Sequence, residues 1–229
     1  MSNETLPFYQ ILGNLRKSVT ITKLPGLVAI LSSPSGTGKT TICRNLIHRH
    51  NDYKFSISAT TRPLRGKEKN GVDYYFVKEQ QFDQMIQNNE LAEWAFVFGH
   101  RYGTPFTEIT EAISHNKVLL CDIDVQGGTT LKDKYRQAVT IFLIPPSFTE
   151  LRRRLFKRKT DSAEQKKMRL ETAVKELGYW HRYDYIVLNE DLKEATNEVD
   201  MIITAERAKT IRRNERRFWE SGQARLLGL

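Results

Sequence analysis

The sequence predicts an α/β fold, in which a parallel sheet is flanked by helices and a small mixed α+β unit is inserted. Four short apolar runs have the composition of buried parallel strands, and each precedes a helix signal. A glycine-rich turn joins the first run to its helix. Between residues 60 and 102 the pattern changes to strand-like pieces of alternating polarity, which indicates the insertion.

The four predicted strands are apolar on both faces. They are residues 27–33 (LVAILSS), 117–124 (KVLLCDID), 138–146 (AVTIFLIPP) and 183–189 (YDYIVLN). A helix is expected over residues 39–50, after the first strand. Ser147 and Glu150 have the spacing of a capping box that opens another helix. Ser162 and Gln165 repeat it before a helix that runs toward residue 181.

The insertion is expected to be a small antiparallel unit. Its strand-like pieces are DYYFV (73–77) and LAEWAFVFG (91–99), with a short helix around residues 82–88 between them. Alternation in DYYFV predicts that Tyr75, Phe76 or both pack into its small core.

The composition is that of a globular protein, with 39% hydrophobic and 28% charged residues in 229. No run reaches the roughly eighteen apolar residues of a membrane span, and the first ten residues do not read as a signal peptide. We therefore expect a cytoplasmic protein with no membrane partner. Residues 1–24 are expected to form an N-terminal extension before the first strand. Cys43 and Cys121 are expected to be buried apolar residues, because no disulfide or metal-binding pattern includes them.

The formal net charge of +9 implies attraction to anions, and both nucleic acid and phosphorylated metabolites fit that description. The basic residues gather in residues 152–167 and 207–217, where a solvated helix face is the simpler explanation.

The glycine-rich turn, SPSGTGKT over residues 33–40, matches the phosphate-loop pattern G-x-x-x-x-G-K-[ST] except at its first glycine, here Ser33. A small residue can leave a strand at that point with ordinary torsion angles. Lys39 is expected near the β- and γ-phosphates and Thr40 as a Mg²⁺ ligand. The predicted ATP-binding residues of this segment are Ser33, Pro34, Ser35, Gly36, Thr37, Gly38, Lys39, Thr40 and Thr41. A chance glycine-rich turn is the alternative, and the flanking strand and helix count against it.

Asp122 and Asp124 stand at the end of a second parallel strand, where such a loop requires an acidic group close to the metal. The alternative is a solvated strand end. In the insertion, Arg62 and Arg65 lie three residues apart on a predicted turn, so together they can clamp a second phosphate, with Tyr74 adding a hydroxyl donor.

The stretch TTRPLRGKEKNGVDYYFV over residues 60–77 resembles the signature of the guanylate kinase family. Further matching pieces are LAEWA (91–95), RYGT (101–104) and the DID of residues 122–124 before VQG. The resemblance covers about residues 27–203. It implies a P-loop NTPase-type core (25–58 and 105–229), a GMP-binding insertion (59–104) and a helical lid (about 154–169). It also implies the reaction of ATP with GMP to give ADP and GDP.

The resemblance implies roles for particular residues. The GMP phosphate is held by residues that match Arg62, Arg65, Tyr74 and Tyr102, and guanine is read by those that match Ser58, Glu93, Thr104 and Asp124, with Asp122 beside them. Arg154, Arg158 and Arg169 match the phosphate-binding arginines of the lid, and Asn189 matches a position beside adenine. For Asn189, capping of the helix that follows is an equal alternative.

Guanine chemistry agrees with these assignments. A carboxylate such as Glu93 suits the N1–H and exocyclic amine donors, and the hydroxyls of Ser58 and Thr104 can donate to O6. Adenine would leave such buried groups unpaired, so we expect GMP to be preferred over AMP by a large factor.

The expected mechanism is direct in-line transfer from Mg-ATP, with Lys39, Arg154, Arg158 and Arg169 acting on the moving group. Thr40 would hold Mg²⁺, and Asp122 would bind it through water. A regulatory GTPase is a rival, since residues 124–127 fit a D-x-x-G element, but an N-K-x-D element is missing. A kinase-like scaffold without catalysis and nucleic-acid binding through residues 205–219 are further rivals. A homo-oligomer is compatible with the sequence.

Overall fold

The computed structural model describes residues 24–157 and 163–209. Its main sheet has the strand order β2-β7-β1-β8-β9, and every neighbouring pair is parallel. The strands are β1 (Leu27–Ser32), β2 (Tyr53–Phe55), β7 (Val118–Asp122), β8 (Val139–Ile144) and β9 (Tyr185–Leu188). Each of the four predicted runs contains one of these strands, which end one to two residues earlier than expected. The α/β fold class is confirmed.

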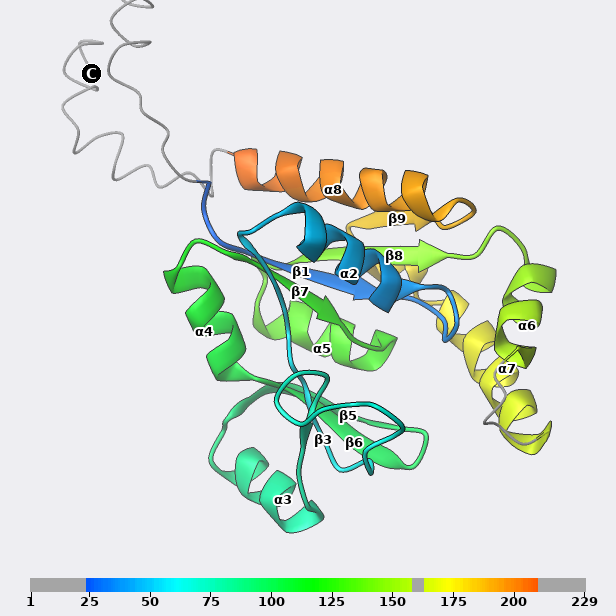
Figure 1. Cartoon of the computed structure of the whole chain (residues 1–229), viewed down its shortest axis with the longest axis horizontal. Coiled ribbons are helices and arrows are strands. Elements are labelled where there is room, and N and C mark those ends of the chain that lie inside the picture. Colours follow the sequence, from blue (N-terminus) through cyan, green and yellow to red (C-terminus); the bar gives the residue numbers. More distant parts are fainter. Residues whose placement is uncertain (1–23, 158–162, 210–229) are drawn as a thin grey trace, which may run out of the picture.

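Helices cover both faces of this sheet, as Figure 1 shows. Alternate residues of β1 point to opposite faces: Leu27 and Leu31 pack with α2 (Lys39–Arg49) and α8 (Leu192–Ala208), whereas Val28 and Ile30 pack with α4 (Phe106–Ser114) and α5 (Val125–Lys134). Because every residue of β1 is buried, the strand has the two-sided apolar composition of a central parallel strand. Cys43 and Cys121 lie buried in this core, as expected.

The inserted unit has its own four-stranded sheet, in the order β4-β3-β6-β5. Its elements are β3 (Ala59–Thr60), β4 (Tyr75–Phe76), α3 (Glu79–Gln87), β5 (Leu91–Val97) and β6 (His100–Pro105). Pairing between β3 and β4 is parallel, so the expectation of a purely antiparallel insertion is wrong. Residues 61–74 return the chain to the start of β3, and β4 therefore enters the sheet in the direction of β3.

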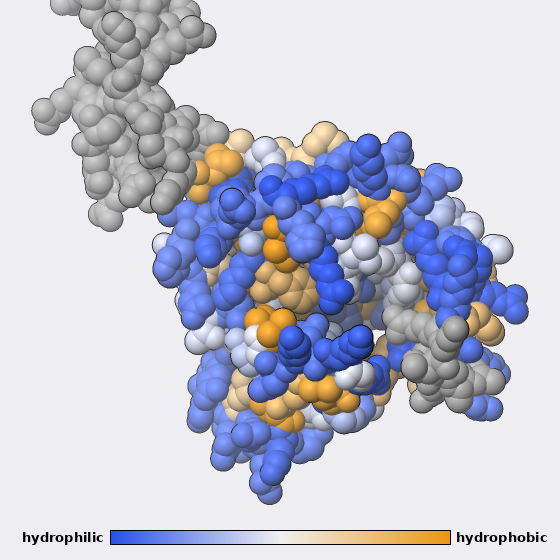
Figure 2. All heavy atoms as spheres, in the orientation of Figure 1, coloured by the Kyte–Doolittle hydropathy of each residue, from blue (hydrophilic) through white to orange (hydrophobic). Residues whose placement is uncertain are grey.

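The insertion is thin, and its small core surrounds Phe82, with Tyr75 packed against it as the alternation predicts. Phe76 instead lies against Arg62 on the other side of the strand. On the face drawn in Figure 2, hydrophilic residues predominate, and hydrophobic residues gather in small groups over the insertion.

Two helices, α6 (Phe148–Phe156) and α7 (Ala163–Leu177), stand beyond the carboxyl end of β8 (Figure 1). Ser147 accepts a hydrogen bond from the Glu150 backbone N–H, as the capping pattern predicts, but the Glu150 carboxylate binds Arg153 and Arg154. The other predicted cap, Ser162, lies outside the described residues. The helix expected to run toward residue 181 stops at Leu177, and a turn of 3₁₀ helix (Trp180–Arg182) follows.

Within residues 24–157 and 163–209, none of the helices has the length and apolar content needed to cross a bilayer.

Candidate active site

A cavity of about 480 Å³ opens where the carboxyl ends of β1 and β7 face the insertion and the helices α6 and α7. Its position agrees with the rule that open parallel sheets bind ligands at the carboxyl ends of their strands. The residues that line it are Ser33, Ser35, Gly36, Gly38, Lys39, Thr40, Thr41, Ser58, Tyr74, Glu93, Val97, Phe98, Tyr102, Asp122, Ile123, Asp124, Arg154 and Glu176. Most of the predicted site residues are therefore gathered around one cavity, although they come from distant parts of the chain.

The glycine-rich turn has the backbone of a phosphate loop. Gly36 and Gly38 have φ angles of 89° and 102°, which only glycine adopts readily. A Cβ on Gly38 would also lie 2.8 Å from the side-chain nitrogen of Asn189. α2 begins directly after this turn without a side-chain cap, and backbone N–H groups at such a helix start can bind an anion.

The side chain of Lys39 contacts both the start of this loop and the end of β7. Its ammonium group donates to the Ser33 carbonyl at 3.1 Å and to the Ser33 hydroxyl at 3.0 Å, and it lies 3.9 Å from a carboxylate oxygen of Asp122. The Thr40 hydroxyl donates to the other Asp122 oxygen. A hydroxyl and a carboxylate therefore sit side by side next to the lysine, and oxygen donors of this kind suit Mg²⁺.

Asn189, which follows β9, also contacts the loop. Its side-chain amide donates to the carbonyl of Thr37, and Arg154 approaches the same carbonyl at 3.4 Å. Asp191, not Asn189, caps α8, so the alternative of a capping asparagine is wrong. Pro34 and Thr37 act within the loop, since the Thr37 hydroxyl donates to the Pro34 carbonyl at 2.8 Å. Arg158, the second lid arginine, lies outside the described residues.

Glu176 is a site residue that the sequence analysis missed. It belongs to α7, and its carboxylate accepts a hydrogen bond of 3.2 Å from the Ser35 backbone N–H of the loop. Burial raises the pKa of this carboxyl group, and the nearby Lys39 opposes that shift. A glutamate in a highly charged helix resembles any solvated residue, and only the fold reveals that it reaches the loop.

Glu93 of β5 lines the cavity in the predicted base pocket. It is only 2% exposed, and its carboxylate accepts a hydrogen bond of 2.6 Å from the Thr104 hydroxyl. Burial raises its pKa to about 7, and the neighbouring Asp124 adds to the shift, while the Thr104 hydrogen bond opposes it. Gly127 makes room for it, because a Cβ there would stand 2.6 Å from a Glu93 oxygen.

Asp124 and Ser58 complete this pocket from two further elements. Asp124 caps α5 by accepting from the backbone N–H groups of Gln126 and Gly127, and Ser58 precedes β3 and is buried. The pocket therefore combines two carboxylates with two hydroxyls, as the guanine interpretation requires.

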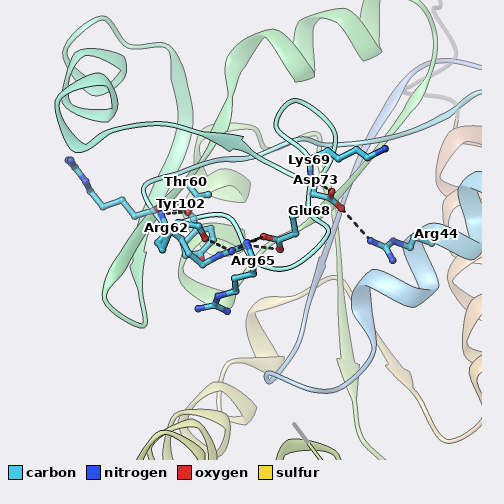
Figure 3. Close-up of polar contacts among 10 residues, drawn as sticks. Arg44, Thr60, Arg62, Arg65, Glu68, Lys69, Asp73 and Tyr102 are labelled. Atoms are coloured by element: carbon cyan, nitrogen blue, oxygen red, sulfur yellow. Dashed lines mark hydrogen bonds and ion pairs between the residues drawn. The ribbon is translucent and has the colours of Figure 1, made fainter. Parts of the chain in front are cut away.

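Arg62 is buried beside the cavity and already has a carboxylate partner, Glu68 (Figure 3). The two side chains form hydrogen bonds of 2.9 and 2.8 Å, and Arg62 also donates to the Tyr102 hydroxyl at 3.2 Å. The Arg62 guanidinium lowers the pKa of Glu68. Sequence reasoning missed Glu68, although its charge and its position shortly after Arg62 and Arg65 could have suggested it.

Arg65 and Tyr74 approach the same region. Arg65 gives only its backbone N–H to Glu68, at 2.8 Å, and its side chain extends away from that carboxylate in Figure 3. The Tyr74 ring lies 5.1 Å from the Arg62 guanidinium carbon and edge-on to Tyr102. Arg62, Tyr74 and Tyr102 are therefore brought together, whereas Arg65 stays at the exposed rim.

Arg169 of α7 lies with its guanidinium carbon 4.3 Å from the centre of the Phe98 ring, at the tip of the hairpin between β5 and β6. Phe98 and Val97 line the cavity, and the sequence analysis singled out neither.

The sequence model of the guanylate kinase family matches residues 27–206. The chain belongs to the guanylate kinase family. A guanylate kinase of Nitrobacter hamburgensis is 49% identical over 82% of this chain and 86% of its own length. One from Carboxydothermus hydrogenoformans is 42% identical over 86% of this chain and 97% of its own. The crystal structure of the guanylate kinase from Anaplasma phagocytophilum superposes with a TM-score of 0.70 at 36% identity, covering 83% of this chain and 90% of that one.

Membership of this family makes the chain an enzyme, an ATP:GMP phosphotransferase. The recognition and the function expected from the sequence are confirmed. The regulatory GTPase and the scaffold without catalysis are no longer needed to account for the loop.

Proposed function

We propose that this guanylate kinase transfers the γ-phosphoryl group of Mg-ATP to GMP by direct in-line displacement, using the residues around the cavity. The observation that carries the proposal is the arrangement of two anion-binding groups and one base pocket on a single cavity. The phosphate loop with Lys39 lies at one side, and Glu93 with Thr104 lies at the other.

On the donor side, the loop over residues 33–41 would bind the ATP phosphates through its backbone N–H groups and the start of α2. Lys39 would place its charge on the β- and γ-phosphates, and Asn189 would lie beside adenine. The hydrogen bond from Asn189 to Thr37 supports this, since it ties the proposed adenine side to the loop.

The acceptor side would hold GMP by its phosphate and by its base. Arg62, Arg65, Tyr74 and Tyr102 would bind the phosphate, which would replace Glu68 as the partner of Arg62. Ser58, Glu93, Thr104 and Asp124 would read guanine, with Asp122 between the two nucleotides. The deoxyribose of dGMP removes none of the contacts proposed here, so we include dGMP as a substrate.

Catalysis would consist of positioning and charge stabilisation, without a covalent intermediate on the protein. Lys39 and the arginines 154, 158 and 169 would neutralise charge on the transferred group, because guanidinium groups aimed at a phosphoryl group stabilise its transition state. Arg154 is supported by its place in the cavity wall, 3.4 Å from the Thr37 carbonyl.

The donor set fits Mg²⁺, since the Thr40 hydroxyl and the Asp122 carboxylate are hydrogen-bonded neighbours beside Lys39. Thr40 would be a direct ligand of the ion and Asp122 would bind it through water, and the ion would offset part of the negative charge of the phosphates. We further propose that residues 25–58 and 105–229 form the core, 59–104 the GMP-binding unit and about 154–169 the lid. The protein would work in the cytoplasm on the small molecules ATP and GMP, without a nucleic-acid or membrane partner.

Labelled phosphate tests direct transfer. With ATP labelled at the γ-position, the label should appear in GDP only when GMP is present, and none should stay on the protein after denaturation. Lys39→Ala should abolish GDP formation while the variant unfolds at the wild-type temperature. A labelled protein that passes its phosphate to GMP would overturn direct transfer, and full activity of Lys39→Ala would overturn the loop assignment.

A further inference from the structure

The tip of the hairpin between β5 and β6 has an unusual backbone. Val97 pairs with His100, so Phe98 and Gly99 form a two-residue turn, with φ angles of 48° and 83°. Turns of this kind favour asparagine followed by glycine, because both residues need a positive φ. Besides Phe98, the non-glycine residues with positive φ in the described part of the chain are Asn89 and Asn116. A bulky aromatic residue at such a position is strained.

The side chain at this strained backbone position does not fill the core. Phe98 remains 36% exposed and lines the nucleotide cavity. Its face meets the Arg169 guanidinium at 4.3 Å, well inside the range of a cation–π contact. The strain and the contact are independent observations that point to the same side chain.

α7 carries two groups toward the site on one face. Arg169 and Glu176 are seven residues apart, which is about two helical turns. Arg169 touches the insertion at Phe98, and Glu176 accepts from the Ser35 N–H of the phosphate loop. The helix therefore joins the insertion to the donor side of the cavity.

We propose that Phe98 is a positioning residue for phosphoryl transfer: its ring holds Arg169 at the mouth of the cavity and links the insertion to α7. This rests on the role proposed above for Arg169 in transfer. Phe98 makes no contact with reacting atoms in this account; it acts through the arginine.

A double-mutant cycle tests the link. Phe98→Ala should lower kcat roughly two- to tenfold, the range that a cation–π contact implies, and Phe98→Tyr should restore it. In an Arg169→Ala background, Phe98→Ala should cause no further loss. Equal losses in both backgrounds would overturn the proposal. Arg169→Ala with wild-type kcat would instead show that the proposed role of Arg169 is wrong, and the positioning role would fall with it.

Phe98→Asn separates function from folding. Asparagine suits the turn, so the melting temperature should stay the same or rise, while kcat falls as in Phe98→Ala. A lowered melting temperature would mean that the ring serves the fold and would overturn the proposal. Phe96→Ala is the matched control, since Phe96 lies two residues earlier and is 62% exposed; it should keep wild-type kcat.

Discussion

Ser33 shows what a single residue adds to the phosphate loop. It stands where the loop pattern has a glycine, and its hydroxyl accepts from Lys39 and donates to the Pro34 carbonyl. A glycine would keep the carbonyl contact with Lys39 and lose the side-chain contact. Serine at this position therefore adds a contact that helps to orient Lys39.

Glu93 is the residue on which base selection would depend most in the proposed site. Glu93→Gln should reduce the preference for GMP over AMP by roughly tenfold or more, because one acceptor of the guanine donors becomes a donor itself. The ratio of kcat/KM for the two nucleotides measures this. Glu90→Gln, on the exposed loop before β5, is the control and should keep the wild-type ratio. An unchanged ratio in Glu93→Gln would place base reading elsewhere.

The raised pKa of Glu93, about 7, predicts a pH dependence. Only the ionised carboxylate can accept both guanine donors, so KM for GMP should rise up to about tenfold per pH unit below 7. Phosphate monoesters also take up a proton near pH 6, and Glu93→Gln should retain only that part of the profile. Identical profiles for the two proteins would contradict a titrating Glu93.

Folding stability should follow the same group with a definite sign. Since the pKa of Glu93 is higher in the folded than in the unfolded chain, its contribution favours folding below about pH 4.5 and is lost as the pH rises toward 7. Glu93→Gln should remove this decline in the free energy of unfolding, measured by urea denaturation at several pH values.

At the scale of elements, the N-terminal ends of α2 and α5 provide many of the residues around the cavity. Asp124 caps α5, and the first turn of this helix places Gly127 against Glu93, so this turn forms one wall of the proposed base pocket. Gly127→Ala should push Glu93 aside and raise KM for GMP more than KM for ATP, because the added Cβ meets a carboxylate oxygen at 2.6 Å. Steady-state kinetics with each nucleotide varied would show it, and equal changes in both KM values would contradict it.

α8 offers a stability test outside the site. Asp191 caps it by accepting from the backbone N–H groups of Lys193 and Glu194, at 2.8 and 2.9 Å. Asp191→Ala should lower the free energy of unfolding by about 1 kcal/mol, whereas Asp191→Asn should cost much less. Chemical denaturation measures both. A loss of the same size in the two variants would mean that the charge, not the cap, stabilises the helix.

The sequence predicted the elements whose signals are local. The strands are continuous apolar runs, the loop is a contiguous motif, and Ser147 caps α6 as its spacing indicates. Contacts made across the fold were not predictable. Glu176 contacts the loop residue Ser35, which is 141 residues away in sequence, and the ring of Phe98 contacts Arg169 of α7. The parallel pairing of β3 with β4 was missed because a long loop, not a hairpin, joins them.

At the scale of the molecule, the cavity lies between the parallel core sheet and an insertion with a small hydrophobic core. The core sheet is buried on both faces, whereas the insertion packs around little more than Phe82. More buried apolar contacts therefore stabilise the core, which carries the phosphate loop, than stabilise the insertion. Phe98 with Arg169, and Arg44 with Asp73 (Figure 3), are contacts that join the insertion to the rest of the chain, and in the proposed function they would influence how the two nucleotides meet.

The central claim is that one cavity binds ATP by its phosphate loop and GMP by a guanine pocket. A coupled assay of ADP formation, with ATP against GMP, dGMP, AMP, CMP and UMP, tests it most directly. We predict rapid turnover with GMP and dGMP, and kcat/KM lower by a factor on the order of 10⁴ with AMP. Comparable turnover with AMP or UMP would contradict the claim.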